Sequence, residues 1–112
     1  MNEPLFLRSE DVEMLHTMAV HRFGGSKGLR DRNAFESAVN QPKNIFYYEQ
    51  GDLFDMAAAY CFHIAQAQAF FDGNKRTGAA AAIVFLDANA YPITGDSMRI
   101  HAALIAVAKG EM

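Results

Sequence analysis

Apolar residues recur every three or four positions in two N-terminal stretches, which predicts two helices. The first is expected to begin at Ser9, a favourable N-cap residue, and to end at the glycine pair Gly24-Gly25. The second is expected to begin after Asp31 and to end before Pro42, because a proline inside a helix removes a backbone hydrogen bond.

Residues 45–48, with the sequence Ile-Phe-Tyr-Tyr, favour β structure, because β-branched and aromatic side chains suit strands. The sequence offers no second strong strand as a partner, so we expect a short hairpin or an extended flap. Such a flap either packs on the core or docks a target segment by strand addition, and the residues alone leave both possibilities open.

Residues 53–67 and about 74–88 are apolar nearly all round, which is typical of buried helices. Asp52 is the expected cap of the first, and only a short loop separates the two, so they should form a central hairpin. A fifth helix is expected to begin at Asp96 and to end at Gly110. The predicted fold is a single, mainly α domain over residues 1–112: a helical bundle with a buried central helix hairpin and a short β-flap.

Composition narrows the class of protein further. The net charge of -3 and the pI of about 5.7 argue against a general nucleic-acid binder, which needs a basic face. The single cysteine, Cys61, cannot form an intramolecular disulfide and lies in an apolar run, so we expect it in the core. Neither a signal peptide nor an apolar run of the ~20 residues that span a membrane is visible, so a cytoplasmic protein is expected.

The loop between the two buried helices carries Asp-Gly-Asn-Lys-Arg at residues 72–76. A loop that bends at Gly73 and opens a helix points free backbone N–H groups outward, and Lys75 and Arg76 add positive charge. Asp72 offers oxygen ligands for a hard cation beside this anion site. The pattern indicates a nucleotide phosphate with Mg²⁺, although an ordinary helix-to-helix turn with solvated charges would contain the same residues.

The run Phe70-x-Asp72-Gly73-Asn74-Lys75-Arg76-Thr77 resembles the motif of the Fic/Doc family, and specifically its Doc (death-on-curing) type. Residues 23–31, 36–38 and 80–91 resemble further segments of the family in the same order, so the resemblance covers about residues 5–110. It implies transfer of part of a nucleotide to a protein hydroxyl. Most members move AMP, whereas the Doc type acts as a kinase and moves the γ-phosphoryl of ATP to a threonine of elongation factor Tu. Lys75 is typical of the Doc type, where AMP-transferring members carry glycine.

The resemblance also implies a role for each motif residue. Asp72 is the expected Mg²⁺ ligand, and Gly73 lets the phosphates approach the backbone closely. Phe70 should anchor the loop in the core. The phosphate oxygens of ATP are expected to be bound by Asn74, Lys75 and Arg76.

Gln68 departs from the motif, which carries histidine at this position as the general base. An amide has no usable basicity near pH 7, and the loss of a positioned base typically costs ~10²–10⁴-fold in rate. The chain is therefore expected to be inactive or weakly active, either as a natural degenerate member or as a toxin disarmed by substitution. The second is favoured, because a growth-arresting toxin is easier to produce without its base. His63 lies about 500° around the helix from Gln68 and is expected to be a packed helix residue instead of a substitute base.

Many members of the family carry an inhibitory helix with the sequence Ser/Thr-x-x-x-Glu-Gly/Asn. The nearest match here is Ser9-x-x-x-Glu13, and Met14 breaks its last position. The resemblance therefore implies inhibition in trans by a Phd-like antitoxin, whose disordered tail would fold as a helix in a groove of this domain. Two alternatives stay open: protein adenylylation, and a catalytically dead domain that binds antitoxin or nucleotide.

Overall fold

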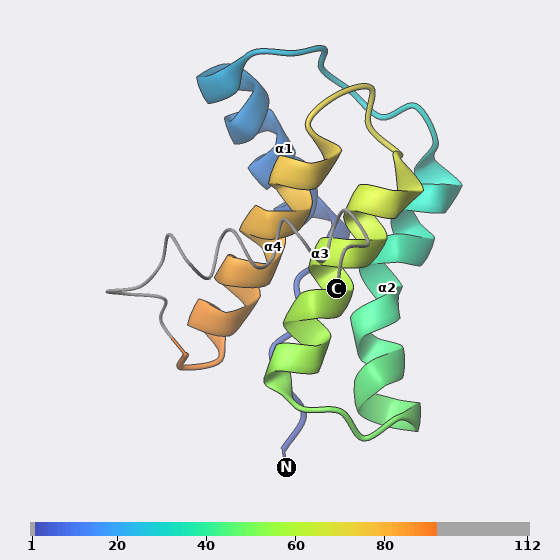
Figure 1. Ribbon diagram of the computed structural model, residues 1–112, viewed down its shortest axis with the longest axis vertical. Helices are drawn as coiled ribbons and strands as arrows, with labels where there is room; N and C mark the ends of the chain where they lie inside the picture. Colours follow the sequence, from blue (N-terminus) through green and yellow to red (C-terminus); the bar gives the residue numbers. More distant parts are fainter. Residues whose placement is uncertain (1, 92–112) are drawn as a thin grey trace.

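The computed structural model describes residues 2–91, which form four helices (Figure 1). These are α1 (Ser9–Phe23), α2 (Arg32–Tyr48), α3 (Leu53–Ala67) and α4 (Asn74–Ala88). The mainly α prediction is confirmed, and the bounds of α3 and α4 match the two predicted buried helices. The expected helix from Asp96 to Gly110 lies outside the described residues. Within residues 2–91, every helix is too short or too polar to span a bilayer.

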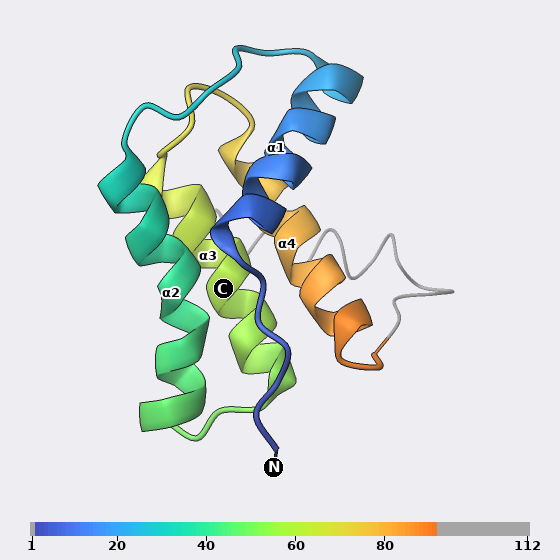
Figure 2. The ribbon, with the colours of Figure 1, turned by 180° about the vertical axis from the view of Figure 1, so that it is seen from behind.

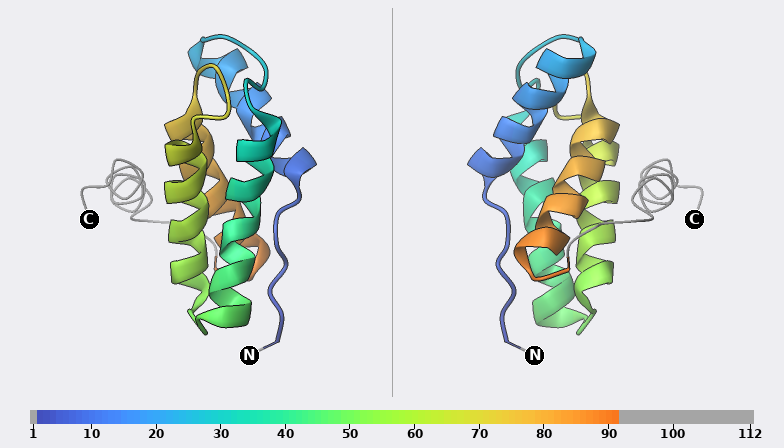
Figure 3. Two further views of the ribbon diagram at one scale, coloured as in Figure 1. Left: turned by 90° about the vertical axis from the view of Figure 1, so that its right-hand side faces the viewer. Right: turned by 90° about the vertical axis from the view of Figure 1, so that its left-hand side faces the viewer.

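Helices α3 and α4 form the central hairpin and share the most extensive helix contact, as the sequence predicts (Figure 3). They approach closely at Gly78, where a Cβ atom would lie 2.6 Å from the carbonyl oxygen of Cys61. Tyr60 and Phe85 are fully buried between them, with ring centroids 5.1 Å apart. Cys61 is buried as expected. Helix α2 covers α3, and α1 packs mainly against α4.

The predicted flap is wrong, because residues 45–48 are the last residues of α2 and the described residues contain no extended strand. The helix continues through Pro42, which is buried inside it. One apolar stripe at helical spacing explains the continuation, since Ile45 and Phe46 pack on the core in line with buried Phe35 and Val39. Their burial offsets the ~3 kcal/mol that an internal proline costs a helix.

The cap predictions hold for two helices. The Asp31 carboxylate accepts the Ala34 N–H at 3.0 Å, and the Asp52 carboxylate accepts the Asp55 N–H at 2.8 Å. At α1 the N-cap is Arg8 instead of the predicted Ser9. The Asp11 carboxylate accepts the Arg8 N–H at 2.9 Å, and this hydrogen bond lowers the pKa of Asp11.

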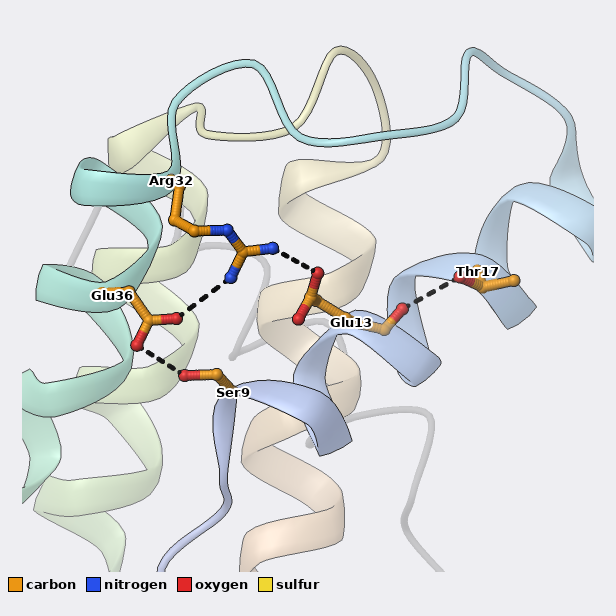
Figure 4. Close-up of polar contacts among 5 residues, drawn as sticks. All are labelled: Ser9, Glu13, Thr17, Arg32 and Glu36. Atoms are coloured by element: carbon orange, nitrogen blue, oxygen red, sulfur yellow. Dashed lines mark hydrogen bonds and ion pairs between the residues drawn. The ribbon is translucent and has the colours of Figure 1, made fainter.

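Ser9 instead joins a polar network that ties α1 to α2 (Figure 4). The guanidinium of Arg32 lies between the carboxylates of Glu13 at 2.9 Å and Glu36 at 3.4 Å. The Ser9 hydroxyl donates to the second oxygen of Glu36 at 2.8 Å. Both residues of the broken inhibitory pattern, Ser9 and Glu13, therefore hold the scaffold together.

An extended segment before α1 runs along the bundle (Figure 2). The Leu7 N–H donates to the buried Tyr60 hydroxyl at 2.9 Å, and desolvation raises the pKa of Tyr60 to about 12. Leu5 exchanges two hydrogen bonds with the side chain of Asn89, at 2.9 and 3.0 Å. These bonds fix the entry to α1, whose far end lies beside the motif loop.

Candidate functional site

The motif loop, residues 68–73, joins α3 to α4 at the opposite end of the bundle from the α2–α3 turn (Figure 1). It borders an open hollow of about 450 Å³, and the structure brings all of the predicted site residues to this one place. The residues lining it are Ala65, Gln68, Phe71, Asp72, Gly73, Asn74, Lys75 and Arg76.

Left-handed backbone angles at two residues shape the loop. Gln68, with φ of 47°, ends α3, and Gly73, with φ of 77°, precedes α4 as its N-cap. No side chain caps the start of α4. A helix N-terminus of this kind presents backbone N–H groups and a partial positive charge, which suits an anion.

The Asn74 side chain spans the loop from the first turn of α4. Its Oδ1 accepts the Phe70 N–H at 3.0 Å, and its Nδ2 donates to the Phe70 carbonyl at 3.0 Å. Both polar groups of the amide thus hold the loop in this structure, whereas the sequence suggested that they bind phosphate. Lys75 and Arg76, by contrast, are exposed at the hollow.

The connector between α1 and α2, residues 24–31, lies against the motif loop (Figure 2). Leu29 and Phe70 form an isolated antiparallel bridge, and the Arg30 N–H donates to the Ala69 carbonyl at 2.6 Å. The Arg30 guanidinium donates to the Gln68 carbonyl at 2.7 Å. This glycine-rich connector therefore braces the motif loop.

Asp72 is oriented from the same connector. The Ser26 N–H donates to its Oδ2 at 2.8 Å, and Gly25 lies so close that a Cβ there would be 3.1 Å from the Asp72 Cβ. The described residues contain no cluster of three His, Cys, Asp or Glu side chains able to hold a metal. One oriented carboxylate fits Mg²⁺, which usually takes one or two protein carboxylates together with phosphates and water.

His16 contacts the loop from α1, and sequence reasoning missed it because it shows no metal-ligand spacing. Its imidazole is buried and stacks on Phe70, with centroids 3.7 Å apart and an interplanar angle of 9°. Its Nε2 lies 2.7 Å from the Asp72 carbonyl oxygen. Phe70 is buried as expected, and its other neighbour Phe35 lies edge-on at 5.2 Å.

Gln68, the residue predicted to replace the motif histidine, is exposed at the hollow. His63 is half-buried on α3 and lies with Ala38 and Gln41 of α2 around a different hollow. Desolvation lowers the pKa of His63. As expected, the imidazole of His63 is therefore a packed side chain away from the motif.

Arg76 also reaches a second hollow, a groove between α1 and α4. Its guanidinium lies 4.5 Å from the ring centroid of Phe23, at the end of α1. The groove has a volume of about 1000 Å³ and combines an apolar floor with the cationic side chains of Arg22, Lys27 and Arg76. Its remaining described lining residues are Leu15, Thr17, Met18, Ala19, His21, Phe23, Ala80 and Ile83.

The sequence of the chain is similar to those of known proteins. Residues 6–86 match the profile of the Fic/DOC family. The chain is 31% identical over 104 residues to "Protein kinase doc" of Escherichia phage P1, covering 92% of this chain and 82% of that protein. It is 37% identical over 93 residues to "Toxin Doc" of Mycolicibacterium smegmatis, covering 81% of this chain and 69% of that protein.

Proposed function

The chain belongs to the Fic/DOC family, and on that premise we propose that it is a Doc-like toxin of a toxin–antitoxin pair. Its reaction is transfer of the γ-phosphoryl group of ATP to a threonine hydroxyl of a translation factor, such as elongation factor Tu. The observation that carries the proposal is the Asp-Gly-Asn-Lys-Arg loop at the uncapped start of α4, with Lys75 and Arg76 exposed beside Asp72.

Phosphoryl transfer depends mainly on positioning and on neutralising charge. The start of α4 would bind phosphate oxygens through backbone N–H groups, with Lys75 as a point charge and Arg76 as a bidentate donor. Arg76 would leave the ring of Phe23 to do so. Asp72 would hold Mg²⁺, which neutralises phosphate charge when bound.

The target hydroxyl must lose its proton as its oxygen bonds to the γ-phosphorus and ADP leaves. Gln68 lies where a base is needed, and its amide is able to hydrogen-bond the hydroxyl but not to take the proton. We therefore expect ATP binding without efficient transfer. The exposed position of Gln68 at the hollow supports a simple test, because a histidine there has room without repacking the core.

The test is the Gln68→His variant, supplied with ATP that is radiolabelled on either the γ- or the α-phosphate, in a bacterial lysate. We expect transfer of the γ-label to one protein at least ~10²-fold faster than in the parent, together with growth arrest on expression. Transfer of the α-label instead would identify a protein adenylyltransferase. If growth is unaffected and neither label is transferred while partner binding stays intact, the chain would be a binding module and not an enzyme.

Gln66→His is the matched control. It makes the same substitution two residues earlier on α3, around the hollow that α3 shares with α2. Because this position does not line the motif hollow, the control should neither transfer label nor arrest growth. Equal gains in the two variants would contradict a role for position 68.

The inhibitor proposed for this toxin is a Phd-like antitoxin that binds the groove between α1 and α4. The apolar floor of the groove suits the apolar face of a helix, and its cationic side chains suit acidic residues on that helix. Arg76 belongs to both hollows, so an occupied groove would also restrain a phosphate-binding side chain. A small acidic protein encoded beside this gene should copurify with the chain.

A further inference from the structure

His16 is a buried polar side chain that the proposed chemistry does not use. It projects from α1, and its imidazole stacks on Phe70 while its Nε2 lies 2.7 Å from the Asp72 carbonyl oxygen. A carbonyl oxygen only accepts hydrogen bonds, so the Nε2 carries a proton and donates it. Because His16 is 3% exposed, water cannot readily replace this bond.

The accepting carbonyl belongs to the peptide group that joins Asp72 to Gly73, the N-cap of α4. Its orientation sets the direction of the chain as it enters α4, whose first residues line the hollow. The same residue is held at its other end, where the Ser26 N–H donates to Oδ2 at 2.8 Å. Asp72 is thus held through its backbone by α1 and through its carboxylate by the connector.

We propose that His16 is a positioning residue for the nucleotide site: its Nε2–H holds the Asp72–Gly73 peptide so that the carboxylate and the start of α4 face one ligand. This inference rests on the proposed function for the identity of the ligand, Mg·ATP. A merely structural histidine would act through its stacking on Phe70 alone. The two contacts use different parts of the imidazole, so substitution can separate them.

Two variants separate the stacking on Phe70 from the hydrogen bond to the Asp72 carbonyl. His16→Phe keeps a flat ring against Phe70 and removes the donor. His16→Gln keeps an N–H donor at similar reach and removes the ring. Met14→Phe and Met14→Gln, at an exposed position of the same helix outside both hollows, control for the introduction of a ring or an amide on α1. Each protein is measured for Mg·ATP affinity by calorimetry and for its melting temperature.

We expect His16→Phe to bind Mg·ATP roughly fivefold to tenfold more weakly than the parent, with a smaller loss of melting temperature than in His16→Gln. His16→Gln should melt lower than the parent but bind within about threefold of it. In the Gln68→His background, the transfer rate should follow the same order. Parent-like affinity in His16→Phe, or an affinity that follows the melting temperature in both variants, would overturn the proposal.

A second measurement tests the role of His16 even if the proposed nucleotide binding is wrong. A parent chain that binds no Mg·ATP would overturn the nucleotide site while leaving the loop geometry to be tested. Amide hydrogen exchange at Phe70, Phe71 and Thr77, whose N–H groups are hydrogen-bonded around the loop, then decides. Faster exchange in His16→Phe than in His16→Gln supports positioning by the donor, and equal exchange in the two overturns it.

Discussion

The fold disfavours protonation of the His63 imidazole. Desolvation lowers the pKa of its imidazole, and the nearby charge of Glu49 opposes this only in part. An unfolded chain then binds a proton at His63 more readily than the folded chain does. Because the unfolded state holds more protons, this residue costs stability as pH falls through its unfolded pKa of about 6.5.

We therefore expect the urea midpoint of the parent to fall more steeply between pH 7.5 and 5.5 than that of His63→Gln. The comparison isolates one imidazole, since the remaining histidines are common to both proteins. Met14→Gln, at an exposed position without a titratable group, should keep the parental slope. Identical slopes in the parent and His63→Gln would show that burial of His63 does not contribute to the pH dependence.

At the site, the sequence could predict that the motif residues lie together, but it could not predict the contacts that hold their loop. Asp72, Gly73 and Lys75 are adjacent in the chain, so a short loop necessarily brings them together. His16 and Ser26 reach that loop only through tertiary packing, and neither residue type at its position indicates a contact. Asn74 also illustrates the limit, because its amide spans the loop in this structure.

At the scale of elements, the close approach of α3 and α4 depends on one glycine. Gly78 lies inside α4, where alanine would favour the helix by about 1 kcal/mol. A Cβ at this position would lie 2.6 Å from the Cys61 carbonyl oxygen, which is backbone and cannot rotate away. The helices would have to separate, and overpacking of this kind typically costs about 1–3 kcal/mol.

Gly78→Ala should accordingly lower the free energy of unfolding by up to about 2 kcal/mol, measured by urea denaturation. Ala80→Gly, two residues along the same helix, serves as the control and should lose about 1 kcal/mol through helix propensity alone. Helix propensity alone predicts that Gly78→Ala stabilises the protein and that Ala80→Gly destabilises it. If both variants are less stable than the parent, the loss in Gly78→Ala must come from the helix contact. A more stable Gly78→Ala variant would mean that the two helices do not pack this tightly.

Most elements followed from sequence because caps and apolar periodicity agreed, as they do at Asp52 and along α3. The exception was α2, where the proline rule and the strand preference of residues 45–48 both pointed away from a helix. The stripe that runs from Phe35 through Pro42 to Phe46 outweighed them. The local preferences against a helix in this segment contribute less free energy than the burial of apolar side chains that the continued helix gains.

For the whole molecule, the groove between α1 and α4 predicts how a partner would be recognised. Met18 lies in the groove and is 60% exposed among the described residues, whereas Met14 lies outside it on the same helix and is 65% exposed. Glutamate at position 18 would place a charge on the apolar floor, neutralise the nearby cations and repel an acidic helix.

Met18→Glu should therefore weaken binding of the proposed acidic partner by about tenfold or more, as measured by calorimetry. Met14→Glu adds the same charge to an equally exposed position and should bind as the parent does. Equal losses in the two variants would indicate a general effect of charge instead of a contact in the groove. Melting temperatures of both variants establish that each protein is folded.

The motif loop is held by residues far earlier in the chain, 56 positions away at His16 and 46 positions away at Ser26. The α3–α4 hairpin needs only a short loop to close, whereas these anchors need a long one, and long-range contacts form more slowly. Translation produces α1 and the connector before the motif emerges. In a nascent chain the motif loop would thus reach its final geometry only when α1 has docked on the finished hairpin, so the proposed site would form only when folding is nearly complete.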